Sequence, residues 1–279
     1  MKARGRLRDW TPLLILPALA YLIVVYAGPL LGLLAKSVSD PSGWSIGPFY
    51  KFFADDYSWR VISNTVYIAV CVTLVCLVVG YPVAFALAWA RGWVQIALLV
   101  AIILPLSIGV VVKAFAWQIV LRRDGIISQL LVGLGLWSEP KRLLFTETGL
   151  ILGAANVFLP FMILPIYSVV KLIDPRLSEA GATLGASPFY GFRRIVLPLT
   201  LQGVVSGIAF VFSLSVSMFV IPSLLIGDRF QTLATLTGRS FLLMRDERLG
   251  STTAVVLLAI AVTIVVASTW ASRRLGGRT

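Results

Sequence analysis

The residues of this sequence best suited to binding a solute are polar side chains inside long apolar stretches, where an unsatisfied polar group is costly. They are Lys113, Trp117, Asn156, Ser213, Ser217 and Asn64. An ammonium, an indole N–H, amides and hydroxyls are groups that can hold a solute. The chain has no histidine, and its apolar stretches contain no carboxylate, so histidine-dependent triads and His metal sites are excluded. We expect neither catalytic nor metal-binding residues.

Lys113 is the only ionised residue in these stretches, and Trp117 follows one helical turn later on the same face. Two interpretations of Lys113 are open. Since it lies about six residues from one end of its stretch, its stem can carry the ammonium to the membrane surface. In the alternative, the ammonium faces a cavity and favours an anionic or zwitterionic solute.

The four remaining candidates also have two interpretations. Ser213 and Ser217 share a helix face at i, i+4. Like Asn64 and Asn156, they either line the solute path or form hydrogen bonds between helices.

Composition indicates that membrane helices position these side chains. Of 279 residues, 58% are hydrophobic and 13% are charged, whereas soluble domains carry about 25% charged residues. Six stretches are long enough to cross a bilayer core, which takes about 20 helical residues. They are 11–34, 61–89, 96–118, 149–170, 200–224 and 252–271. The sequence therefore predicts one all-α membrane domain over 1–279 with six transmembrane helices, and proline within five of them predicts bends.

The distribution of charge between the loops predicts the orientation. The termini and the loops on their side hold 12 basic and 3 acidic residues, against 11 basic and 9 acidic in the longer loops opposite. Basic residues concentrate in short cytoplasmic flanks, so we expect both termini in the cytoplasm. The net charge of +12 is thereby explained by orientation, and no nucleic-acid partner is expected.

One loop on the predicted cytoplasmic side, residues 171–199, carries the clearest motif. Pro175 followed by helix-favouring residues predicts a short helix. Gly185 then lies where the helix would end, and Pro188 prevents its continuation. A short exposed helix of this kind is suited to docking on a protein partner.

This loop resembles the EAA loop in permease subunits of bacterial ATP-binding-cassette (ABC) importers. That pattern is Glu-Ala-Ala, three residues, Gly, nine residues, Ile, one residue and Leu-Pro. The residues at its fixed positions are Glu179, Ala180, Gly181, Gly185, Ile195, Leu197 and Pro198. Only Gly181 departs from the pattern, and glycine in place of alanine loosens a helix by up to about 1 kcal/mol.

The resemblance implies the binding-protein-dependent, MetI-like type I permease fold, in which this loop forms a cytoplasmic coupling helix. By that match, Glu179, Ala180, Gly181 and Gly185 would form or shape the contact with an ATPase dimer, and Pro198 would fix the re-entry into the fifth span. No lysine follows a glycine, so the chain lacks the Gly-Lys step of a phosphate-binding loop. We expect no cofactor on this chain, with ATP and Mg²⁺ bound by a separate ATPase subunit.

Beyond the loop, the order of the spans and two short runs, Leu144–Thr146 and Leu159–Met162, are similar to the first permease of spermidine/putrescine-type importers. This similarity implies a multi-pass protein of the bacterial inner membrane that passes a polyamine inward. The implied partners are a second, related permease in a heterodimer, the ATPases and an extracytoplasmic solute-binding protein. Two alternatives are an importer of an anionic or zwitterionic solute (an opine, an amino-acid-like compound or a phosphonate) and a stand-alone ion-coupled transporter.

Overall fold

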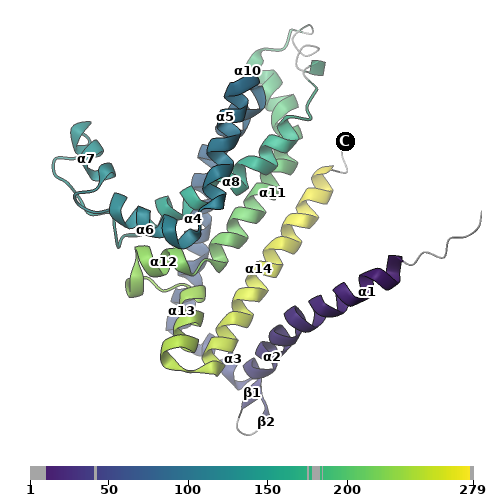
Figure 1. Ribbon diagram of the computed structural model, residues 1–279, viewed down its shortest axis with the longest axis vertical. Helices are drawn as coiled ribbons and strands as arrows, with labels where there is room; N and C mark the ends of the chain where they lie inside the picture. The colour runs from purple at the N-terminus through teal and green to yellow at the C-terminus, as the bar shows by residue number, and fades with distance from the viewer. Residues whose placement is uncertain (1–10, 41–42, 175, 178–182, 184, 277–279) are drawn as a thin grey trace, which may run out of the picture.

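The computed structural model describes residues 11–40, 43–174, 176–177, 183 and 185–276, and most of this part of the chain is helical (Figure 1). Five helices are long and apolar enough to cross a membrane. They are Leu19–Ser37, Asp56–Trp89, Glu147–Val170, Pro188–Ser217 and Glu247–Trp270. Two helices with a sharp bend between them, Gly92–Ser107 and Val110–Val120, pass the same test only when taken together. The expected all-α architecture is therefore observed.

The elements in chain order are α1 (Thr11–Leu22), η1 (Ile23–Ala27), α2 (Gly28–Ser37), β1 (Ser39–Asp40), β2 (Gly43–Trp44), α3 (Gly47–Ala54), α4 (Asp56–Trp89), α5 (Gly92–Ile103), η2 (Leu104–Ser107), α6 (Val110–Val120), α7 (Ile126–Gly133), α8 (Glu147–Val170), α10 (Pro188–Gly191), η3 (Phe192–Val196), α11 (Leu197–Ser217), α12 (Val220–Leu225), η4 (Gly227–Arg229), α13 (Leu233–Arg239), η5 (Ser240–Met244) and α14 (Glu247–Gly276). The two strands pair antiparallel, with Ser39 opposite Trp44. We call this side of the molecule the hairpin end and the opposite side the α10 end.

The predicted third span, 96–118, is not one straight helix. Its two parts, α5–η2 and α6, are inclined by 104°. Pro105 lies in the 3₁₀ turn η2, and the two residues that follow this turn, Ile108 and Gly109, have extended backbone. Proline lacks the N–H that would continue the helical hydrogen bonds. The bend therefore follows from local sequence, and α6 leaves the bundle sideways (Figure 1).

The predicted fifth span, 200–224, also differs from the structure. At its α10 end the helix continues without a break from Pro188 to Ser217. At its other end, Met218 is extended, with ψ of 128°, and separates α11 from the short helix α12. The span is therefore longer than predicted at one end and interrupted at the other.

Three helices start before the apolar stretch that predicts them, and each has an acidic residue in its first turn. These residues are Asp56 of α4, Glu147 of α8 and Glu247 of α14. A carboxylate at a helix N-terminus is stabilised by the helix dipole. All three helices run from the hairpin side toward the α10 end (Figure 1).

Helix α8 is the centre of the bundle, packed between α4 and α11. Its Met162 is fully buried. A Cβ added at Gly80 of α4 would lie 3.1 Å from Met162 Cγ, and one at Gly207 of α11 would lie 2.7 Å from Met162 Sδ. One turn away, a Cβ at Gly203 would lie 2.8 Å from the Pro165 carbonyl oxygen. Small residues therefore allow these helices to approach closely, as membrane helices commonly do.

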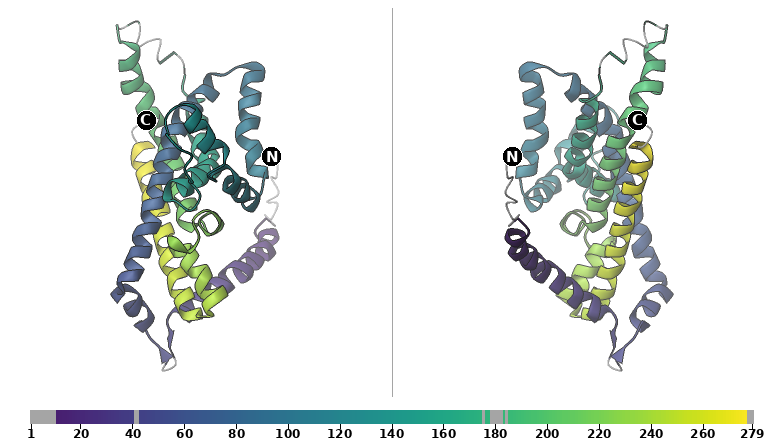
Figure 2. Two further views of the ribbon diagram at one scale, coloured as in Figure 1. Left: turned by 90° about the vertical axis from the view of Figure 1, so that its left-hand side faces the viewer. Right: turned by 90° about the vertical axis from the view of Figure 1, so that its right-hand side faces the viewer.

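The N-terminal helix α1–η1–α2 stands apart from this bundle. Its apolar stretch within Leu19–Ser37 is 0% buried, and Figure 2 shows α1 pointing away from the other helices. Its α2 part packs on α14, and Lys36 of α2 forms an ion pair with Glu247 of α14. An exposed apolar helix of this kind is suited to contact with lipid or another membrane subunit.

The glycine contacts of α11 yield a prediction. Gly203→Ala places a methyl group against backbone atoms of α8, which cannot rotate away, and should cost roughly 1–3 kcal/mol. Gly207→Ala meets the end of the flexible Met162 side chain first and should cost less. We expect the melting temperature of the detergent-purified protein to fall in that order.

The matched control is Gly133→Ala in α7, since a Cβ at Gly133 has no heavy atom within 4 Å. Its melting temperature should not fall. Equal stability of the Gly203→Ala and Gly133→Ala proteins would contradict the close packing of α8 on α11.

Candidate functional site: a polar junction and a coupling segment

Two of the six candidate path residues meet in the structure. The Trp117 indole Nε1 of α6 donates a hydrogen bond to Asn156 Oδ1 of α8, at 3.2 Å. Asn156 is exposed within its helix, whereas Trp117 is half-buried against it. The bend before α6 brings the two together. The pair forms a polar junction on a membrane helix, a place where an exposed amide requires a polar neighbour or an aqueous path.

Lys113 lies one turn before Trp117 on α6 and is half-buried. No hydrogen bond or ion pair joins its ammonium to another described residue. Because α6 turns away from α5 by 104°, distance along the sequence no longer measures the depth of Lys113 in the membrane. The depth of Lys113 therefore cannot be taken from a straight span, and its two interpretations, an ammonium at the membrane surface and an ammonium facing a cavity, both stay predictions.

The two serines do not form a site with each other. Ser217 Oγ donates to the Ser213 carbonyl oxygen of its own helix, at 2.9 Å. Ser213 Oγ is buried and has no partner among the described residues. Both serines lie in the last turns of α11, directly before the interruption at Met218. The polar face that they share therefore ends with the helix.

Asn64 has a structural contact. Its Nδ2 donates to the carbonyl oxygen of Gln231, at 3.2 Å, and the neighbouring Thr65 Oγ1 accepts a hydrogen bond from Leu233 N, at 2.8 Å. These two bonds attach the segment before α13 to the side of α4. Asn64 therefore bonds to the loop before α13 rather than to another helix, and its role in the solute path stays a prediction.

Glu147, in the first turn of α8, was not among the predicted residues, because it precedes the apolar stretch 149–170. The available signal was Thr146, which caps α8 by accepting from Gly149 N at 3.1 Å. A capping threonine followed by an acid is typical of a helix start.

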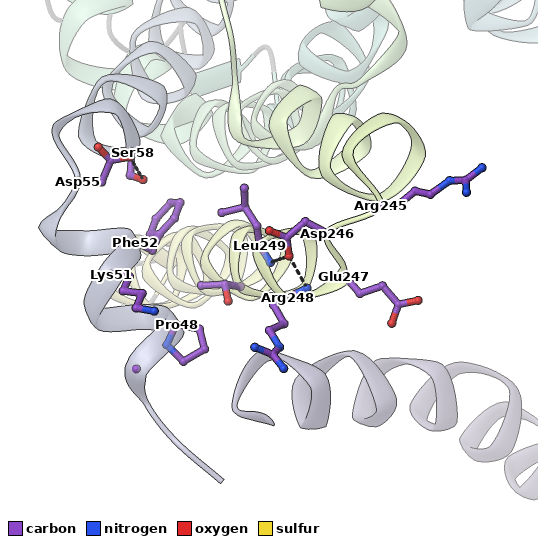
Figure 3. A pocket seen from close by; sticks show the side chains of 12 residues that line it. Pro48, Lys51, Phe52, Asp55, Ser58, Arg245, Asp246, Glu247, Arg248 and Leu249 are labelled. Carbon is purple, nitrogen blue, oxygen red and sulfur yellow. Dashed lines mark hydrogen bonds between the residues drawn. The ribbon is translucent and has the colours of Figure 1, made fainter. Parts of the chain in front are cut away.

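A charged cavity of about 850 Å³ lies at the hairpin end, between α3, the start of α4 and the start of α14 (Figure 3). Its charged lining residues are Lys51, Asp55, Arg245, Asp246, Glu247 and Arg248. Asp246 accepts hydrogen bonds from the backbone N–H groups of Arg248 and Leu249, at 3.1 and 3.0 Å. Both signs of charge are therefore presented within one concave surface.

The predicted coupling helix falls partly outside the described residues, which do not include Glu179, Ala180 and Gly181. Gly185 is described and has φ of +83°, a left-handed conformation that side chains with a Cβ rarely adopt. Ser187 then accepts a hydrogen bond from Tyr190 N, at 3.3 Å, and caps α10 with Pro188 in its first turn. The glycine and the cap together explain why the chain turns sharply here.

Pro198 has a different position from the one expected. It lies within the first turn of α11, which continues from α10 and the π-helical turn η3. The helix therefore begins at Pro188, and Ser187 rather than Pro198 marks where the chain enters it. Proline fits at Pro198 because a π-helical turn precedes it, where regular i to i−4 bonding is already interrupted.

The surface around this segment is apolar and basic. Leu172 is 85% and Phe189 is 72% exposed. A cavity of about 540 Å³ is lined by Ser187, Phe189, Tyr190, Arg193 and Arg194. The Arg194 guanidinium lies 6.0 Å from the centroid of the Tyr190 ring. Exposed aromatic and arginine side chains are typical of protein interfaces.

Comparison with known proteins gives a family and a fold. Residues 77–276 match the family described as binding-protein-dependent transport system inner membrane component. The chain is 32% identical over 206 residues to the spermidine/putrescine transport system permease protein PotB of Haemophilus influenzae, covering 74% of this chain and 72% of that one. It is 31% identical over 226 residues to PotB of Escherichia coli, covering 81% and 82%.

Among solved structures, a bacterial alginate ABC transporter in complex with an alginate-pentasaccharide-bound periplasmic protein is similar in fold. The TM-score is 0.77 at 17% identity, with 96% of each chain covered. At this identity the likeness concerns the fold alone.

The attachment of the 231–233 segment to α4 can be tested by stability. Thr65→Val leaves the N–H of Leu233, a buried residue, without its acceptor, which should cost roughly 1–3 kcal/mol and lower the melting temperature. Thr263→Val is the control, because Thr263 makes the same bond to the carbonyl four residues earlier but is exposed. Equal melting temperatures of the two variants would show that the bond from Leu233 does not hold the segment.

Proposed function

The chain belongs to the family of binding-protein-dependent transport system inner membrane components and is a permease subunit of an ABC importer; we propose that the solute it carries is a polyamine. The observation that carries this proposal is identity of about one third with PotB proteins over most of both chains. The permease family and the all-α membrane fold predicted from sequence are thereby confirmed, while the number of spans and the coupling helix stay predictions. The alternative of a stand-alone ion-coupled transporter is not supported, because relatives of this kind are components of ATP-driven systems.

One feature of the structure suits a polycationic solute. Helices α4, α8 and α14, which run toward the α10 end, have acidic first turns, at Asp56, Glu147 and Glu247. Acidic groups attract ammonium groups by charge. Lys113 favours the opposite charge, and an anionic or zwitterionic solute remains the second candidate on that observation.

ABC importer permeases work with an ATPase and a binding protein. In our proposal, ATP and Mg²⁺ are bound by a separate ATPase dimer, and this chain binds no cofactor itself. The ATPase docks on the segment around Glu179, Ala180, Gly181 and Gly185. The exposed apolar and arginine side chains beside Gly185 support this docking.

The chain is a multi-pass protein of the inner membrane. We place the α10 end and both termini in the cytoplasm, which puts the hairpin end outside. The charged cavity shown in Figure 3 is then available to the solute-binding protein. A second, related permease in a heterodimer would cover Asn156, a polar group whose exposure to lipid is costly, and would pack on the exposed apolar stretch Leu19–Ser37.

The solute class is tested by uptake in proteoliposomes that contain the assembled transporter and its binding protein. We expect ATP-dependent uptake of labelled putrescine or spermidine. We also expect unlabelled polyamines to compete, and glutamate or phosphonates not to compete. Competition by the anionic or zwitterionic compounds alone would replace the polyamine with the second candidate.

Coupling is tested with Glu179→Ala and Gly185→Val. Valine at φ of +83° is strained by roughly 1–2 kcal/mol, so the segment should change shape while the helices insert normally. Both variants should retain ATP hydrolysis and lose solute-stimulated hydrolysis and uptake. Gly133→Val, at an open helical position, should behave as wild type. Unchanged uptake in both coupling variants would count against the docking segment.

A further inference from the structure

A small cavity between α12, η4 and α13 has the groups needed to bind an ammonium. It has a volume of about 260 Å³, and its lining includes Phe219, Asp228, Gln231 and Arg239. A water molecule takes about 30 Å³ in the liquid, so the cavity has room for the end of an aminoalkyl chain. It is below the usual range for a site that encloses a whole drug-sized ligand, about 300–1,000 Å³. The site therefore suits one terminal group of a longer molecule.

Gln231 supplies a buried hydrogen-bond acceptor. The residue is only 8% exposed, and its Oε1 has no partner among the described residues. Its Nε2 is directed to Asp228 Oδ1, at 3.5 Å, which leaves the carbonyl oxygen as the unsatisfied atom. A buried amide oxygen requires an N–H or O–H donor.

Asp228 supplies the charge. Its side chain is 82% exposed, and its Oδ1 lies 3.4 Å from Arg239 Nη1. An exposed and long ion pair of this kind is weak, so an incoming cation can compete with Arg239 for the carboxylate. An anion could pair with Arg239, but it would be repelled by Asp228 and would leave Gln231 Oε1 without a donor. The geometry therefore favours an ammonium group.

Phe219 forms a fixed apolar wall. It follows the interruption at Met218, and a Cβ at Gly238 would lie 2.4 Å from Phe219 Cε2, so the ring rests directly on the glycine of α13. The backbone of Gln231 is fixed as well, because Asn64 Nδ2 donates a hydrogen bond to its main-chain carbonyl oxygen. The Gln231 amide, the Asp228 carboxylate and the Phe219 ring therefore belong to three separate segments that meet at the cavity.

We propose that this cavity is an entry subsite for the terminal ammonium group of the transported amine, an inference that rests on the proposed polyamine function. The ammonium donates to Gln231 Oε1 and Asp228 Oδ1 and displaces Arg239. The interruption of α11 thus serves to place Phe219 at the entrance.

The kinetic test compares Asp228→Asn and Gln231→Leu in reconstituted transporter with its binding protein. Each should raise KM for putrescine uptake roughly tenfold, the loss expected for a charge-assisted hydrogen bond, with basal ATP hydrolysis unchanged. Each should also lose the preference for putrescine over its mono-acetylated form, which a merely structural defect would not change. Asp124→Asn is the control, because Asp124 forms an exposed pair with Arg122 at the same 3.4 Å. Unchanged KM and preference would overturn the subsite.

A labelling test separates the subsite from the transported solute. Ser223→Cys, at the cavity lining, is introduced with Cys71→Ser and labelled with a maleimide in the assembled complex. Butylammonium should slow labelling roughly tenfold, and butyrate should not; Gln231→Leu should remove the protection. Protection without polyamine uptake would retain the subsite and overturn the proposed solute. Polyamine uptake without protection would overturn the subsite and retain the proposed solute.

Discussion

The close approach of three helices at Met162 is the contact on which the rest of the structure depends. In a membrane, apolar side chains gain little by leaving lipid for protein, so packing and polar contacts must hold the helices together. Gly80 and Gly207 allow α4 and α11 to pack directly against the Met162 side chain from two helices. This packing holds α8 in a fixed position between α4 and α11. It thereby also positions the Asn156 amide of α8, which accepts the hydrogen bond from Trp117.

The interruptions of the helices supply the polar chemistry. Pro105 and Gly109 turn α6 out of line, and Met218 ends α11 early. Backbone that is neither helix nor sheet is tolerated at membrane depth only where protein or water satisfies it. The structure meets this condition with long-range bonds, such as Gln118 Nε2 to the Leu224 carbonyl oxygen at 2.6 Å. The segments that interrupt the spans therefore also carry the side chains that could meet a solute.

Much of the fold could be predicted because apolar length is a local signal. The stretches 61–89 and 149–170 locate α4 and α8 to within a few residues of their starts. The bend after α5 could not be placed from Pro105, since prolines at positions 82 and 160 lie inside continuous helices. The bond from Asn64 to Gln231 joins residues 167 positions apart, and no local pattern indicates it. Asp228 and Gln231 were missed for the same reason, because their significance depends on a cavity formed by packing.

The continuous helix from Pro188 to Ser217 has a mechanical consequence. Thirty residues at about 1.5 Å each form a rod of roughly 45 Å, which starts beside Gly185 and ends at the interruption before Phe219. A rod of this length acts as a lever: a tilt of about 5° about one end moves the other by roughly 4 Å, more than the length of a hydrogen bond. The π-helical turn η3 lies close to the Gly185 end of this helix. Bending of the helix at η3 would therefore reduce the displacement of its far end less than bending near the middle. A small push at one face of the membrane is thereby sufficient to rearrange polar contacts near the other.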